Sequence, residues 1–163
     1  MSPKMKKFLS YYRPYLKIFT IDMVCALTAS GTNLAFPLLV RYIALNLLQP
    51  SPQALAPFLV VTGIMVAMII VEYYCNFFIT YYGHLMGAKM ESDLRQELFE
   101  HLQKLSFSFY DNQKTGQLMS RIVNDLFEIT ELYHHGPEDL LISAVKLTGS
   151  FIILMTINAK LTL

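Results

Sequence analysis

Three long apolar segments constrain the fold of this 163-residue sequence more than any other feature. The first runs from Ile18 to Asn46. The second, from about residue 54 to Ala88, carries a formal charge only at Glu72, and the third, Leu140 to Asn158, is interrupted only by Lys146. A bilayer core requires about 20 mainly apolar residues per helix, and each segment meets that length. The sequence therefore predicts three membrane helices.

The overall composition agrees with a membrane protein, because 54% of the residues are hydrophobic and only 15% are charged. The formal net charge of +1 gives no sign of nucleic-acid binding, and we expect none. Cys25 and Cys75 lie inside apolar segments without CxxC spacing, so we interpret them as packed side chains rather than as a disulfide or a metal site.

Basic residues predict the orientation of the helices. They lie before the first segment and between the second and the third, whereas residues 47–57 carry no charge. These basic residues are Lys4, Lys6, Lys7, Arg13 and Lys17, then Lys89, Arg95, Lys104, Lys114 and Arg121. By the positive-inside rule the amino terminus and the long central segment are cytoplasmic, in a multi-pass protein of the cell membrane.

The predicted helices continue beyond the bilayer as two amphipathic stripes with helical spacing. Their members are Met90, Leu94, Leu98, Leu102 and Leu105, then Leu118, Ile122, Leu126, Ile129 and Tyr133. Two such arms of roughly 20 residues form an antiparallel hairpin that projects about 30 Å. We expect an all-α membrane protein with a cytoplasmic amino-terminal elbow (1–17) and helices at about 18–46, 54–106 and 116–158.

A polar segment joins the two stripes. Its composition predicts a short helix at about 108–115 that lies across the ends of the arms. We expect Tyr110, Asn112, Gln113 and Lys114 to face outward, and Gly116 to permit a sharp change of direction.

The segment FYDNQKTGQLMSRIVND resembles the first intracellular loop of ABC exporters, whose pattern is F-[FY]-D-x-x-x-T-G-x-L-x-S-R-x-x-N-D. The matching positions are Phe109, Tyr110, Asp111, Thr115, Gly116, Leu118, Ser120, Arg121, Asn124 and Asp125. The last residues, NAKLTL, resemble the end of the family's third membrane helix, N-W-x-L-T-L, with Ala159 at the usual tryptophan. The early YYRPY resembles the family's amino-terminal elbow.

This resemblance implies that residues 18–163 are part of a six-helix transmembrane domain. Such a domain is coupled to nucleotide-binding domains that hold ATP and Mg²⁺, and it pairs with a second transmembrane domain as a homodimer or heterodimer. The short tip helix would be the first coupling helix. By position, the implied contact residues are Tyr110, Asp111, Asn112, Gln113, Lys114, Thr115 and Gly116. The implied cargo is a small molecule, a lipid or a peptide.

The 163 residues contain no GxxxxGK[ST] phosphate loop and no LSGGQ-type signature. We therefore expect no cofactor and no ATP hydrolysis in this chain alone, with the nucleotide-binding domain absent from it. An alternative function, from another class, is a membrane regulator or sensor that retains an exporter-like hairpin without transport.

Two charges lie deep in the predicted spans. Glu72 is about 22 Å from Pro57 along its helix, and Lys146 is about 10 Å from Asp139, so both fall in the inner half of the bilayer. We hypothesise that they face each other or line one cavity. An ion pair, substrate contact and snorkelling to the interface remain three alternatives.

The sequence shows no catalytic constellation, and we predict neither a catalytic residue nor a metal site. His134 and His135 are adjacent and so point to different helix faces, while His84 and His101 stand alone in the sequence. We interpret all four as interfacial or solvated side chains.

Overall fold

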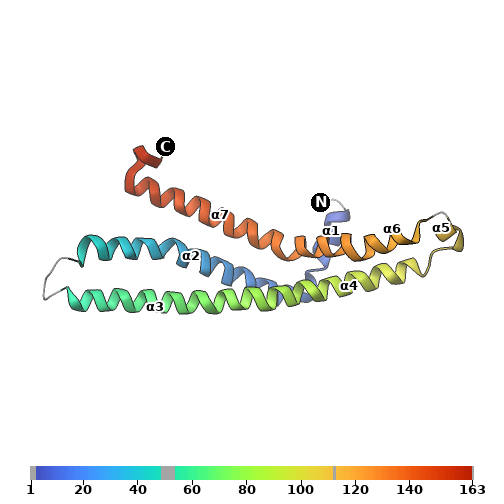
Figure 1. The fold of residues 1–163 in the computed structure, drawn as a ribbon, viewed down its shortest axis with the longest axis horizontal. Helices are drawn as coiled ribbons and strands as arrows, with labels where there is room; N and C mark the ends of the chain where they lie inside the picture. The colour runs from blue at the N-terminus through green and yellow to red at the C-terminus, as the bar shows by residue number, and fades with distance from the viewer. Residues whose placement is uncertain (1–2, 49–53, 112, 163) are drawn as a thin grey trace. The chain divides into compact units, whose positions relative to one another are not determined.

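The computed structural model describes residues 3–48, 54–111 and 113–162, and side chains from residue 6 onward. These residues form helices joined by short turns, with no strand among them (Figure 1). The elements are α1 (Pro3–Ser10), η1 (Arg13–Tyr15), α2 (Leu16–Asn46), α3 (Leu55–Phe78), η2 (Ile79–Gly83), α4 (His84–Leu102), α5 (Phe107–Asp111), α6 (Thr115–Ser120), η3 (Arg121–Asp125) and α7 (Leu126–Thr162). The predicted all-α class is confirmed.

Within the part of the chain that the structure describes, three helical runs are long and apolar enough to cross a membrane, judged by length and composition. They are Lys6–Asn46, Leu55–Leu102 and Thr115–Thr162. The second and third runs each contain one turn of π-helix, η2 and η3. A π-turn inserts an extra residue into a helix and shifts the face on which later side chains lie.

The prolines at positions 37 and 137 lie inside α2 and α7, where each removes one backbone donor. Near its end α7 departs from helical geometry at Asn158, with φ −158° and ψ 95°. The Asn158 side-chain Oδ1 accepts a hydrogen bond from the Leu161 amide at 3.2 Å, which satisfies one backbone donor of the last turn.

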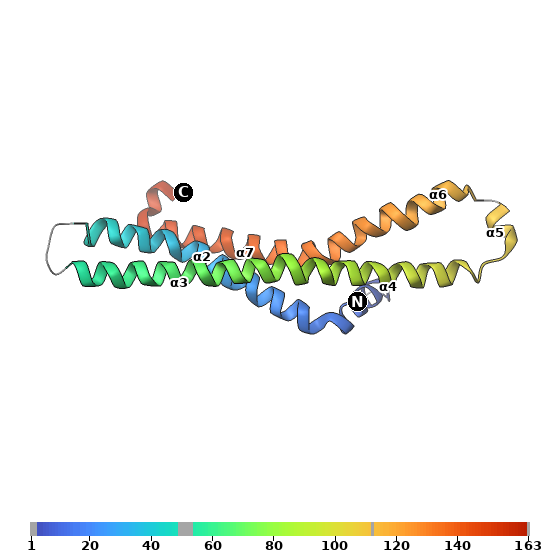
Figure 2. The same ribbon diagram turned by 60° about the horizontal axis from the view of Figure 1, so that its bottom comes forward.

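The described chain divides into two compact units. The hairpin unit takes residues from 1–20 and 81–137, and the membrane unit takes residues from 21–80 and 138–163. Within the hairpin unit, α4 runs alongside α6 and the first part of α7 (Figures 1 and 2). Within the membrane unit, α2 and α3 lie side by side in both views.

Four buried side chains form the core of the hairpin unit, namely Tyr12, Met86, Met90 and Tyr133. The Tyr12 hydroxyl donates a 2.6 Å hydrogen bond to the backbone carbonyl of Tyr133. Phe8 stacks on the Tyr133 ring, with centroids 4.0 Å apart. The amino-terminal elbow is therefore anchored by burial on both arms of the hairpin.

A polar rim borders this aromatic core along one face of α4. Glu97 accepts a hydrogen bond from Lys7 at 2.7 Å and a second one from the Tyr11 hydroxyl. One turn earlier, Asp93 accepts a 2.7 Å hydrogen bond from Tyr15. Because the Lys7–Glu97 pair is solvent-exposed, it sets the register of the elbow more than it stabilises the fold.

Most side chains of the two predicted stripes are buried or half-buried. Met90 and Leu102 of the first stripe are buried, as are Ile122, Leu126 and Tyr133 of the second. Ile129 differs, because 44% of its side chain remains exposed although its spacing places it in the stripe.

The membrane unit has the opposite distribution, with large apolar side chains outside and small ones inside. In α2 the buried residues include Ala26, Ala29 and Ser30. A Cβ atom on Gly149 of α7 would lie only 2.4 Å from Leu34 Cδ1 of α2, so these two helices approach closely at that glycine. Small residues at close helix contacts are typical of membrane packing, where lipid covers the apolar exterior.

We predict that Tyr12→Phe destabilises the elbow, because the buried Tyr133 carbonyl loses its donor at a cost of about 1–2 kcal/mol. Thermal unfolding of the complete protein in lipid nanodiscs measures the effect. Tyr74→Phe is the matched control, since 65% of Tyr74 is exposed. Equal melting temperatures for the two variants would contradict this assignment.

Candidate functional site

The tip between α4 and α6 contains the sequence-predicted contact residues, and Figure 1 shows α5 at this turn. Tyr110, at the end of α5, donates a 2.6 Å hydrogen bond from its hydroxyl to the Leu102 carbonyl at the end of α4. The Gln113 amide then donates to the Tyr110 carbonyl at 3.1 Å. The tip helix is thus tied directly to the arm that precedes it.

These contacts correct the expected outward direction of Tyr110. Its side chain is half-buried, and its hydroxyl points back to Leu102. The sequence motif places an aromatic residue here, but it does not reveal that the hydroxyl meets a carbonyl at the end of α4. Any contact that Tyr110 makes with a partner remains a prediction.

Other predicted contact residues form an accessible surface. Asp111, Gln113, Lys114, Thr115 and Gly116 are exposed, and Asn112 lies outside the described residues. The Lys114 carbonyl accepts hydrogen bonds from the Gln117 and Leu118 amides, which starts α6. This leaves the side chains of the short connection available to a partner.

Phe107 is a tip residue that the sequence argument missed. Its side chain is 90% exposed at the start of α5, beside the polar connection. The sequence signal that could have identified Phe107 is an apolar ring next to a polar turn. Exposed aromatic side chains are common anchors of protein interfaces, so Phe107 joins the candidate contact surface.

In the membrane unit, Asn33 links α2 to Glu72 of α3. Its side-chain Nδ2 donates 2.9 Å hydrogen bonds to both the Ala29 carbonyl and Glu72 Oε1. An amide donor is a favourable partner for a carboxyl group in a span, where water is scarce. The three alternatives drawn from the sequence for Glu72, namely an ion pair, substrate contact and snorkelling, did not include this amide partner.

Lys146 lies on α7 in the same unit, with an exposed side chain. Among the described residues, the ion pairs within 4.0 Å do not include one between Glu72 and Lys146. Their placement around one cavity remains a prediction.

A cavity of about 500 Å³ lies between α2 and α7 within the membrane unit. Its walls are mostly apolar, with Asn33, Arg41 and Ser150 as polar residues. The lining residues are Asn33, Leu34, Pro37, Leu38, Arg41, Ser150, Ile153, Leu154 and Ile157. Such a lining can accept an apolar body with a polar or anionic group near Arg41.

The structure also corrects the interpretation of the histidines. His84 of α4 lies beside His134 and His135 of α7, with ring centroids 4.9 Å and 5.3 Å away. Sequence separation hid this cluster, because its members come from opposite arms of the hairpin unit.

Comparison with known proteins covers almost the whole chain. The family profile for the ABC transporter transmembrane region matches residues 19–163. YwjA of Bacillus subtilis, named as an ABC transporter ATP-binding protein, is 42% identical over 160 residues, which is 98% of this chain and 27% of YwjA.

Two further relatives come from the same organism. YknV, an ABC transporter ATP-binding protein, is 30% identical over 98% of this chain and 26% of its own length. YgaD, named as a putative multidrug export ATP-binding/permease protein, is 28% identical over 98% of this chain and 28% of its own length. The chain therefore spans about a quarter of the relatives it matches.

We predict that Asn33→Ala lowers the stability of the complete protein in nanodiscs by about 1 kcal/mol, because Glu72 loses its amide donor. Asn46→Ala is a matched control, since Asn46 also donates to the carbonyl four residues earlier, at 3.1 Å, and within the described ranges its side chain makes no hydrogen bond to another helix. An equal fall in melting temperature for both variants would show that the Glu72 contact contributes nothing.

Proposed function

This chain belongs to the family of ABC transporter transmembrane regions, and from that premise we propose that it forms the membrane-spanning part of an ATP-driven exporter. The proposal draws on the relatives named for ATP binding and, in YgaD, for multidrug export. The observation that carries it is the tip: α5 is tied to α4 through Tyr110, and exposed polar residues follow it.

The partners in this proposal are nucleotide-binding domains and a second transmembrane domain. ATP and Mg²⁺ would bind to the nucleotide-binding domains, and this chain would receive their motion at the tip. The exposed Phe107 would supply an apolar anchor for docking, and Lys114 an exposed positive charge. These two residues suit a partner surface with an apolar pocket and acidic groups beside it.

The tip suits mechanical coupling because it is not a loose loop. The Tyr110–Leu102 bond transfers displacement of α5 to the end of α4, and α4 is continuous with α3 in the run Leu55–Leu102. On the other side, α6 continues into α7 through η3. Pushing or pulling the tip would therefore move helices that enter the bilayer, as alternating access requires.

The membrane unit would contribute part of the substrate pathway. The cavity beside Asn33 and Arg41 favours an amphipathic cargo, whether a small molecule, a lipid or a peptide. Glu72 and Lys146 are proposed to face this pathway or each other. Ionisable side chains at membrane depth frequently mark such routes.

The proposed orientation places the amino terminus, the hairpin unit and the tip in the cytoplasm, with the spans in the cell membrane. Its support is the distribution of lysine and arginine. The charged rim of Lys7, Asp93 and Glu97 agrees with a surface that meets water.

Reversing the charge of Lys114 is expected to uncouple the proposed exporter. In the complete protein in proteoliposomes, Lys114→Glu should lower drug-stimulated ATPase activity about tenfold, since coupling free energies are commonly 1–3 kcal/mol. Membrane insertion, measured by protease accessibility, should not change, because Lys114 is exposed.

Lys104→Glu is the matched control for this charge reversal. Lys104 is also exposed, but it precedes the tip helix. Unchanged ATPase activity in Lys114→Glu, or equal losses in both variants, would argue against a coupling contact at Lys114. ATPase activity that never responds to any transported compound would favour a regulator or sensor.

A charge-swap cycle tests the proposed relation between Glu72 and Lys146. If they interact, Glu72→Lys and Lys146→Glu should each impair drug-stimulated ATPase activity, and the double variant should recover much of it. Losses that simply add in the double variant would reject the pairing and leave separate roles for the two residues.

A further inference from the structure

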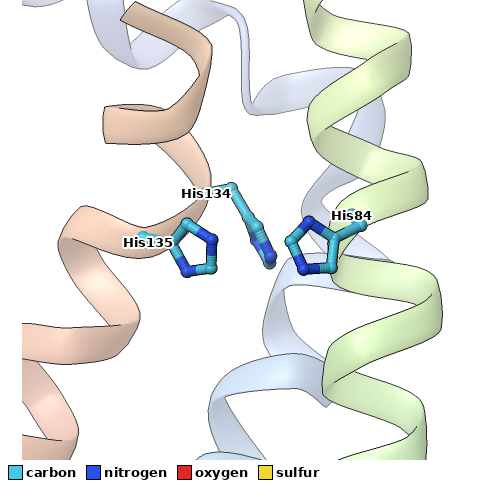
Figure 3. A group of neighbouring side chains, drawn as sticks. All are labelled: His84, His134 and His135. Atoms are coloured by element: carbon cyan, nitrogen blue, oxygen red, sulfur yellow. The ribbon is translucent and has the colours of Figure 1, made fainter. Parts of the chain in front are cut away.

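Three imidazole rings from two different helices meet within the hairpin unit (Figure 3). His84 comes from the first turn of α4, and His134 and His135 come from α7. The ring centroids of His134 and His135 are 4.4 Å apart, and the His84 centroid lies 4.9 Å and 5.3 Å from them, so all three rings are mutual neighbours. One nitrogen from each ring lies within 4.8 Å of the other two.

Backbone shape holds the central ring in place. A Cβ atom at Gly83 would lie 2.2 Å from His134 Cε1, so the ring occupies space that only glycine leaves open. A Cβ atom at Gly87, one turn further along, would lie 3.6 Å from the Cβ of His134, which is ordinary van der Waals contact. His134 is consequently 2% exposed and seated against α4.

A π-turn, η2, directly precedes one member of the cluster. It covers Ile79–Gly83 and ends immediately before His84. Figure 3 shows the His84 ring directed toward His134. π-turns in helices frequently accompany functional sites.

A carboxylate orients one of the three rings. His135 Nε2 lies 3.4 Å from Glu131 Oε2, one helical turn earlier on α7. This contact leaves His135 Nδ1 as the nitrogen available to a ligand. A carboxylate on the far nitrogen is the usual second partner of a metal-binding histidine, because it sets the tautomer and raises ligand basicity.

We propose that His84, His134 and His135 bind a divalent transition-metal ion, with Zn²⁺ as the reference ligand. Three imidazoles suit Zn²⁺, Ni²⁺, Co²⁺ or Cu²⁺ and do not suit Mg²⁺ or Ca²⁺, which take oxygen ligands. In a tetrahedral zinc site, nitrogens about 2.0 Å from the metal lie about 3.3 Å apart. Small side-chain rotations would close the observed spacing to that value.

The site would bridge the two arms of the hairpin. His84 is exposed, so the ion can enter from that side and a fourth position remains for water or another ligand. Because ligands come from both α4 and α7, a bound ion would resist separation of these helices. Metal binding would thus adjust the stiffness of the hairpin, a property beyond the proposed transport function.

Zn²⁺ titration of the complete protein in nanodiscs tests the proposal by calorimetry, after removal of any polyhistidine tag and treatment with EDTA. His84→Ala is the main variant, because its exposed side chain can be removed with little risk to folding. His101→Ala is the matched control, since His101 is also exposed on α4 but lies outside the cluster.

We expect one high-affinity Zn²⁺ per chain that is retained in His101→Ala and weakened by about tenfold or more in His84→Ala. Co²⁺ should give visible ligand-field bands in the wild type and lose them in His84→Ala. His135→Ala should weaken binding similarly, which guards against an indirect effect of one variant.

Three results would overturn the metal site: no stoichiometric Zn²⁺ binding by the wild type, equal weakening in His84→Ala and His101→Ala, or unchanged affinity in both His84→Ala and His135→Ala. Melting temperatures without metal identify any variant that misfolds. These outcomes do not depend on transport, so failure of the metal site leaves the exporter proposal intact.

Discussion

The hydrogen bond from the Tyr12 hydroxyl to the Tyr133 carbonyl is the contact on which the hairpin unit depends. It joins residues 121 positions apart within a core of aromatic rings and two fully buried methionines. Elbow residues cover the apolar side chains Met86 and Met90 of α4 and Tyr133 of α7. This buried polar bond, surrounded by well-packed side chains, acts together with the exposed rim contacts to Glu97 and Asp93 to give the elbow one defined position on the hairpin.

The hairpin and membrane units follow different physical rules. In the hairpin unit large side chains such as Met86 are buried and charges form the rim, as in a water-soluble helical bundle. In the membrane unit small side chains are buried, and a close approach such as Gly149–Leu34 replaces the apolar core. Among the polar contacts there, the Asn33–Glu72 bond joins two helices through their side chains.

The proposed roles of the tip and of the histidine cluster both concern the hairpin unit, but they differ in kind. Phe107 and Lys114 are exposed at the tip, and in the proposed function they would meet the partner that delivers the force. The histidines lie between the arms, where a bound ion would make the hairpin more rigid by resisting the separation of α4 and α7. A coupling contact and a metal site in one hairpin are therefore compatible, and their tests read out separate properties.

The sequence by itself determined the all-α class, the three apolar helices and the polar tip, because periodicity and segment length act locally along the chain. Only the tertiary structure decided three contacts. The Tyr110 hydroxyl donates a hydrogen bond to the Leu102 carbonyl, and the Asn33 side chain donates one to Glu72. The ring of His84 lies beside those of His134 and His135. Each of these contacts joins different helices. Their geometry depends on helix rotation, on π-turns and on glycine clearance, none of which hydrophobic spacing encodes.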